Sequence, residues 1–79
     1  MVLADKLKQI SGKTYNIRVE KIIQGRALVV VDDKWHARLN HYDYDGPREL
    51  LKRGNEFRGV GELYHDEGAL NLRIKQIID

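Results

Sequence analysis

Aromatic rings and positively charged groups are interleaved along the middle and the end of this chain. A ring face can stack on another flat group, and an arginine or lysine side chain attracts anionic oxygens. Gathered on one surface, the two kinds of side chain would recognise a ligand that carries both planar groups and negative charge. The candidate residues for such a surface are Arg26, Lys34, His36, Arg38, Tyr44, Tyr64 and His65.

Other chemistry has weaker support in the residue types. His41, Asp43 and Asp45 occupy alternate positions, and zinc accepts imidazole and carboxylate ligands, but this spacing matches no established metal-binding pattern. The chain has no cysteine, and Ser11 is its single serine, so nucleophilic catalysis has almost no candidate side chain. We therefore expect a non-catalytic domain, not an enzyme, without a metal ion or cofactor.

The length of 79 residues limits the chain to one small domain. A domain of this size buries only about 60% of the surface that its unfolded chain exposes, which leaves room for one core. The net charge of +2 permits a nucleic-acid partner without requiring one. No apolar run approaches the roughly 18 residues that a membrane span needs, so we expect a cytoplasmic location and no membrane partner.

Alternation of apolar and polar residues predicts the strands. Tyr15, Ile17 and Val19 alternate with polar residues, which is typical of a half-buried strand. The alternation slips by one residue at Lys21, and such a slip predicts a β-bulge. A hairpin turn is expected at Gln24-Gly25. Further strands are predicted at 27–31, 35–39, 57–63 and 70–74, with Trp35 facing the core alongside Ala37 and Leu39.

Helical spacing occurs in two short segments. Leu3, Leu7 and Ile10 share one face of a predicted N-terminal helix over residues 1–12, which ends at Gly12. A second short helix is predicted between the third and fourth strands, from Pro47 to Gly54, because proline favours the first helical position and glycine ends helices. Its apolar residues, Leu50 and Leu51, would plug one end of the sheet.

The order of these elements predicts a closed barrel over residues 13–79. An open five-stranded sheet of this size would leave two edges exposed, and closure removes them. The bulge near Lys21 and the pair Gly59 and Gly61 fit the sharp bends that closure requires. We therefore expect an all-β protein, a five-stranded OB-fold Greek-key barrel with a short helix between strands 3 and 4 and an added N-terminal helix.

Three stretches of the C-terminal half carry a family resemblance. They are residues 50–57 (LLKRGNEF), 66–68 (DEG) and 70–75 (LNLRIK). A short helix ending in a basic-glycine step, an acidic turn with glycine, and a last strand ending in isoleucine-lysine make this half similar to the OB-fold barrels of the ribosomal S-one-type RNA-binding family. The resemblance implies binding of single-stranded nucleic acid, with RNA favoured over DNA.

The barrel also predicts where a ligand would bind. Single strands lie across the second and third strands of OB barrels and their flanking loops. Arg26 and Arg38 would contact phosphate there, and Tyr64, Tyr44 or His36 would stack on bases. We expect binding of single-stranded RNA or DNA on this face.

An alternative function is open at this point. Leu28 and Val30 have the outward parity of the second strand, and the apolar stripe of the N-terminal helix needs a surface to pack on. The domain would then be a protein-interaction or assembly module, its barrel face covered by that helix or by a partner chain, a homodimer included.

Overall fold

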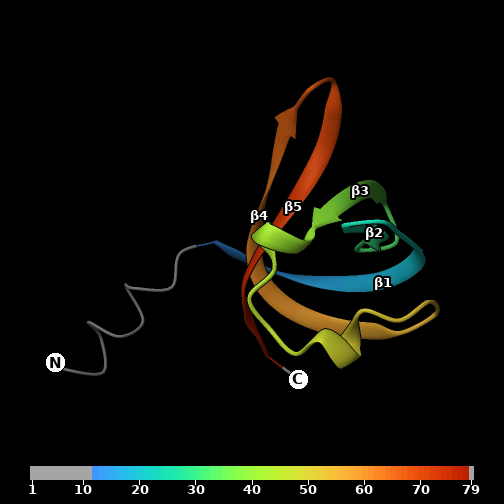
Figure 1. Cartoon of the computed structure of the whole chain (residues 1–79). Helices are drawn as coiled ribbons and strands as arrows, with labels where there is room; N and C mark the ends of the chain where they lie inside the picture. The colour runs from blue at the N-terminus through green and yellow to red at the C-terminus, as the bar shows by residue number, and fades with distance from the viewer. Residues whose placement is uncertain (1–11, 79) are drawn as a thin grey trace, which may run out of the picture.

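The alternating segments of the sequence form five β-strands in the computed structural model, which describes residues 12–78. All five predicted strand segments fall inside the observed strands, so that prediction is confirmed (Figure 1). The strands are β1 (Lys13–Ile23), β2 (Arg26–Val31), β3 (Trp35–Asn40), β4 (Glu56–Asp66) and β5 (Ala69–Ile77).

The five strands close into a barrel in the order β1-β2-β3-β5-β4. Strand β1 makes closure possible because it pairs along 17–23 with β2 and along 13–18 with β4. The register of the β1–β2 pair shifts between Val19 and Lys21, which confirms the predicted bulge. Every pairing is antiparallel except that of β3 with β5, which is parallel.

The core fills the barrel with the residues of inward parity. Ile17 and Val19 from β1 meet Val29 and Val31 from β2, and each of these side chains is almost fully buried. Leu50 and Leu51 lie half-buried against this core, in the position predicted for a plug. The remaining members of the cluster are Tyr15, Ala27, Ala37, Leu39, Phe57, Leu72 and Ile74.

Glycines let β4 and β5 approach closely. A Cβ atom at Gly61 would collide with the carbonyl oxygen of Arg73, and one at Gly59 would lie 3.1 Å from the carbonyl oxygen of Gln76. The β4–β5 register shifts between Val60 and Gly61, so a second bulge accompanies the glycine pair. The bulge supplies the sharp bend that was predicted at these glycines.

The predicted short helix between β3 and β4 is confirmed only in part. The chain instead forms two single 3₁₀ turns, η1 (His41–Asp43) and η2 (Arg48–Leu50). A longer helix would need the amide of Gly54 to donate to the carbonyl oxygen of Leu50. That amide donates to Val19 of β1 at 2.7 Å, and the Asn55 side chain occupies the Leu50 oxygen, also at 2.7 Å. Tertiary hydrogen bonds therefore limit the predicted helix to the single turn of η2. The predicted N-terminal helix (1–12) lies outside the described residues apart from Gly12.

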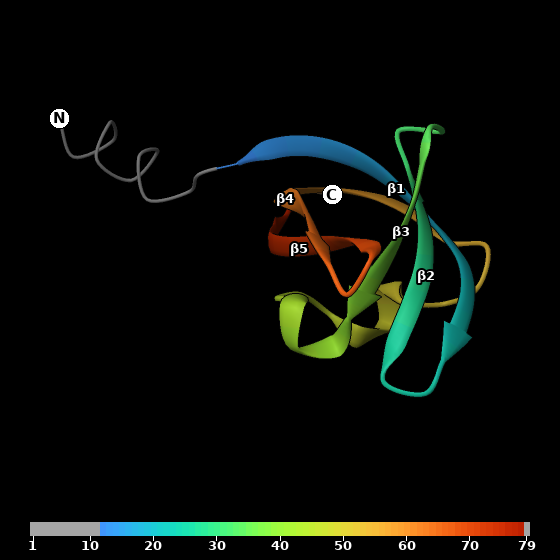
Figure 2. The same cartoon turned by 90° about the horizontal axis from the view of Figure 1, so that it is seen from above.

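Trp35 is not a core residue, contrary to its predicted inward position. Its side chain is 39% exposed, and the Lys34 ammonium lies 4.9 Å from the ring centroid. Trp35 pairs with Val31 beside the β2–β3 turn, which projects beyond the rest of the barrel (Figure 2). The core has no further layer there to cover the indole, so parity alone does not bury it.

The contact at Gly61 gives the first prediction. We expect Gly61→Ala to lower the free energy of unfolding by about 1–3 kcal/mol, because the new methyl group must push the two strands apart. Gly68→Ala is the control: that glycine has positive φ (73°) but open space around it. Urea unfolding of both variants checks this. A Gly61→Ala loss no larger than that of Gly68→Ala would contradict the close approach.

Candidate functional site

A groove of about 400 Å³ crosses the outward face of β2 and β3. Leu28 pairs with Arg38 and Val30 pairs with His36, so these side chains form adjacent rows on that face. His36 and Arg38 line the groove, together with the half-buried Leu28. The structure therefore brings together two of the predicted site residues, one aromatic and one cationic.

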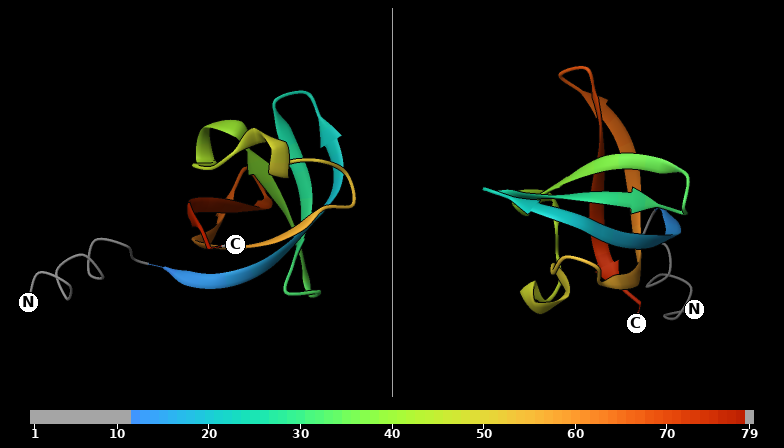
Figure 3. Two further views of the ribbon diagram at one scale, coloured as in Figure 1. Left: turned by 90° about the horizontal axis from the view of Figure 1, so that it is seen from below. Right: turned by 90° about the vertical axis from the view of Figure 1, so that its right-hand side faces the viewer.

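Two other elements form the walls of the groove. The bulge in β1 places Lys21 opposite Leu28, and Lys21 becomes a lining residue. On the opposite side, the β4–β5 hairpin projects well beyond the barrel and contributes Ala69 and Leu70 (Figures 1 and 3). Sequence reasoning did not assign Lys21 or Leu70 to the site, although the slip in alternation at Lys21 was a usable signal.

Arg38 is fixed at the edge of the groove by the β4–β5 hairpin. Its guanidinium donates to Asn71 Oδ1 and to the carbonyl oxygen of Asp66, both at 3.3 Å. The Glu67 carboxylate lies 3.9 Å away and offsets part of the positive charge. Glu20 also lines the groove, but its carboxylate accepts from Arg18 Nε at 3.2 Å. The groove thus offers one fixed cation, Arg38, together with the exposed Lys21 and an apolar floor.

The other predicted site residues lie elsewhere. Lys34 is exposed on the β2–β3 turn, and His65 is exposed near the end of β4, beyond the groove lining. Arg26 and Tyr44 line a separate pocket that also contains Leu39. The structure does not assemble these four residues with His36 and Arg38 into one lining.

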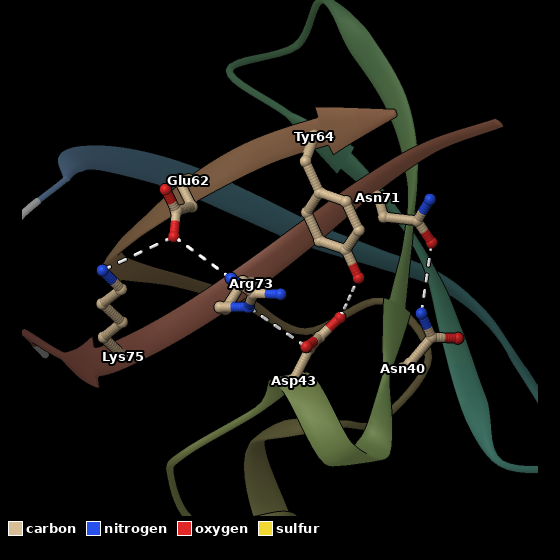
Figure 4. Close-up of polar contacts among 7 residues, drawn as sticks. All are labelled: Asn40, Asp43, Glu62, Tyr64, Asn71, Arg73 and Lys75. Atoms are coloured by element: carbon tan, nitrogen blue, oxygen red, sulfur yellow. Dashed lines mark hydrogen bonds and ion pairs between the residues drawn. The ribbon is translucent and has the colours of Figure 1, made fainter. Parts of the chain in front are cut away.

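Tyr64 belongs to a polar network on the outside of β4 and β5 (Figure 4). Its hydroxyl donates to the carboxylate of Asp43 in η1, and Arg73 Nε donates to the same carboxylate at 3.2 Å. The Arg73 guanidinium lies 4.9 Å from the centroid of the Tyr64 ring. Glu62 continues the network, with Arg73 at 3.4 Å and Lys75 at 3.5 Å. Tyr64 is half-buried, its hydroxyl already donates to Asp43 and its ring already contacts Arg73.

A second polar group joins β3 to β5. Asn40 Nδ2 donates to Asn71 Oδ1 at 3.1 Å, and both residues are buried. Asn71 Nδ2 in turn donates to the carbonyl oxygen of Ala69 at 3.0 Å. Sequence reasoning missed Asn40, Asn71 and Arg73, because a polar residue of outward parity predicts exposure unless its partner is known. Asp43 was noted only as a loop carboxylate.

The pKa values of three side chains on this side of the barrel, Tyr64, Arg73 and Tyr44, are raised above their ordinary values. The pKa of Tyr64 is raised from its ordinary value of 10.0, chiefly because the neutral phenol donates to Asp43. The pKa of Arg73 is raised by its hydrogen bond to the same carboxylate. Burial raises the pKa of Tyr44, with a smaller contribution from Glu49. Asp43 is therefore paired with two groups that hold their protons through neutral pH.

Comparisons with known proteins give no family to which the chain can be assigned. No protein-family model, no curated protein and no solved structure matches the chain. Among residues 12–78, no group of three or more histidine, cysteine, aspartate or glutamate side chains is arranged to hold a metal ion. In the same part of the chain, no helix has the length and apolar character needed to cross a membrane.

The Asp43 network gives the second prediction. We expect Asp43→Ala to reduce the free energy of unfolding by about 2–3 kcal/mol, because Tyr64 and Arg73 lose a shared, buried acceptor. Asp45→Ala is the matched control, since the Asp45 side chain is exposed two residues further on. Thermal and urea unfolding report the difference. Equal stability of the two variants would show that the network contributes nothing.

The raised pKa of Tyr64 gives a third prediction. The phenol must keep its proton to donate to Asp43, so this stabilisation is present below pH 10 and is lost as pH rises through the higher folded-state pKa. The stability difference between the parent and Tyr64→Phe should therefore be constant near neutral pH and shrink above pH 10. Urea unfolding across this range measures it, and a difference that grows in alkali would contradict the assignment.

Proposed function

We propose that this barrel is of the OB type and binds single-stranded nucleic acid in the groove between β2, β3 and the β4–β5 hairpin. The strand order, with β1 shared between two partners and β3 parallel to β5, supports the OB assignment. In OB folds the second and third strands and the loop between the last two strands form the ligand face. RNA is proposed ahead of DNA because of the resemblance noted in residues 50–75.

The observation that carries the proposal is the composition of the groove. Lys21 and Arg38 supply cations along its walls, which suits a phosphate backbone. His36 supplies an exposed ring for stacking, and Leu28 and Leu70 supply apolar surface beside it. The volume of about 400 Å³ lies in the range of small-ligand sites. A base would contact the ring and the apolar surface of this groove, and its flanking phosphate would contact the cations.

A salt titration tests the role of Lys21. If Lys21 contacts a phosphate, Lys21→Ala should weaken binding of short labelled oligo-uridine and reduce the magnitude of the logarithmic salt slope by about 0.7. Lys52→Ala is the control, because Lys52 is exposed and does not line the groove. Fluorescence anisotropy at several salt concentrations provides the slopes. Equal slopes for both variants would remove Lys21 from the interface.

His36 is the test of base stacking. We expect His36→Ala to cost about 1–3 kcal/mol of binding free energy, the usual loss for one stacked base, with little change in thermal stability. His65→Ala is the matched control, since His65 is exposed outside the groove lining. The same anisotropy assay, run with oligo-uridine and oligo-thymidine, also reports the RNA preference. A larger loss for His65→Ala would move the site onto the hairpin.

A further inference from the structure

A second concavity lies on a different part of the barrel from the groove. It has a volume of about 340 Å³ and lies between the β1–β2 hairpin and the segment around η2. Ala27 and Leu39 of the barrel line it, together with Leu51. None of the residues that line the groove lines this pocket, so the two surfaces can be tested separately.

The apolar wall of the pocket is unusually exposed for aliphatic side chains. Ile22 is 50% exposed and Ile23 is 40% exposed, and both line the pocket from the end of β1. Two adjacent isoleucines at a hairpin tip are exposed to water although most large aliphatic residues of the barrel are covered. Contiguous apolar surface beside a concavity is typical of a site for another apolar group.

Two arginine side chains of the pocket lack an ion-pair partner among residues 12–78. Arg26 and Arg48 both line the pocket, and neither guanidinium has a hydrogen bond or an ion pair within residues 12–78. By contrast, Arg18, Arg38 and Arg73 each lie within 4.0 Å of a carboxylate. An unpaired guanidinium at the edge of an apolar surface favours a carboxylate, which it can bind through two parallel hydrogen bonds.

The walls favour a peptide over a nucleobase. Base-binding sites present an open aromatic face. Two rings line the pocket: Tyr44, and the exposed His41, whose Nδ1 lies 2.9 Å from the Gly25 carbonyl oxygen. The Tyr44 ring is half-buried and packs edge-on against Phe57. The exposed surface of Ile22 and Ile23 is aliphatic, and it suits the side chain of a leucine or phenylalanine.

We propose that this pocket docks an acidic segment of a partner protein, in which a bulky apolar side chain enters between the isoleucines while flanking carboxylates pair with Arg26 and Arg48. This surface goes beyond the nucleic-acid groove and does not depend on it. The charge of the rim and the aliphatic wall together define the partner: a short peptide that is both acidic and apolar.

The test uses a fluorescein-labelled synthetic peptide in which a leucine-phenylalanine pair is flanked on both sides by aspartates. The full chain should bind it, and Arg48→Glu should weaken binding about tenfold or more, because an attractive pair becomes a repulsive one. Arg53→Glu makes the same change of charge at an exposed position outside the pocket and should leave affinity within about twofold. Equal effects of the two variants would overturn the site.

A second pair of variants tests the apolar wall. Ile22→Ser should weaken peptide binding several-fold, whereas Ile78→Ser, at a residue 44% exposed outside the pocket, should not. Peptides with serine in place of the apolar pair, or asparagine in place of the aspartates, should bind poorly. No binding of the parent peptide at millimolar concentration would overturn the proposal. Displacement of the peptide by unlabelled oligo-uridine would overturn it too, by assigning the pocket to the nucleic-acid site.

Discussion

The parallel contact between β3 and β5 is the constraint on which the barrel depends. Tight turns hold β1 to β2, β2 to β3 and β4 to β5, whereas the β1–β4 and β3–β5 pairs form only because the sheet curls round on itself, and the β3–β5 pair is the shorter of the two. Their backbone ladder is short, with Arg38 opposite Asn71. An isolated bridge between Tyr44, which follows η1, and Ile74 of β5 extends it. Side chains complete the seam. Asn40 and Arg38 converge on Asn71, while η1 brings Asp43 to Tyr64 and Arg73. Among the described residues, no buried side-chain polar atom lacks a hydrogen bond.

Both proposed binding surfaces depend on the way the barrel closes. Arg38 is held by the β4–β5 hairpin, so the cation at the edge of the groove and the wall that faces it are fixed by one set of contacts. The bulge that bends β1 into closure also directs Lys21 toward the groove. Past the bulge, β1 continues to Ile22 and Ile23, which line the second pocket. Closure of a small barrel thereby produces two separate concavities, one with a ring and cations, for which we propose single strands, and one with an aliphatic wall, for which we propose an acidic peptide.

Patterns of period two were sufficient to predict the strands and the bulge at Lys21, because burial on one face leaves a direct mark on the sequence. The pair Gly59 and Gly61 indicated the sharp bend in β4, because glycine tolerates the close approach that such a bend requires. Trp35 shows where parity fails: a residue can have inward parity and still lie beyond the last layer of the core. The predicted helix at 47–54 is shortened to one 3₁₀ turn by long-range hydrogen bonds, since the carbonyl oxygen of Val19 in β1 accepts from the amide of Gly54. Of the candidate site, His36 and Arg38 were predicted together because they share one strand face. The partners of Tyr64 come from η1 and β5, and their arrangement follows from closure rather than from spacing.

The central claim is that the groove across β2 and β3 is a binding face for single strands. Amide chemical shifts of the isotope-labelled chain, recorded during titration with short oligo-uridine, test it most directly. The account predicts saturable, salt-sensitive shifts at Lys21, Leu28, His36 and Leu70, with little change at Ile23 and Leu51 in the second pocket. Shifts centred on the second pocket, or none at low ionic strength, would contradict the account.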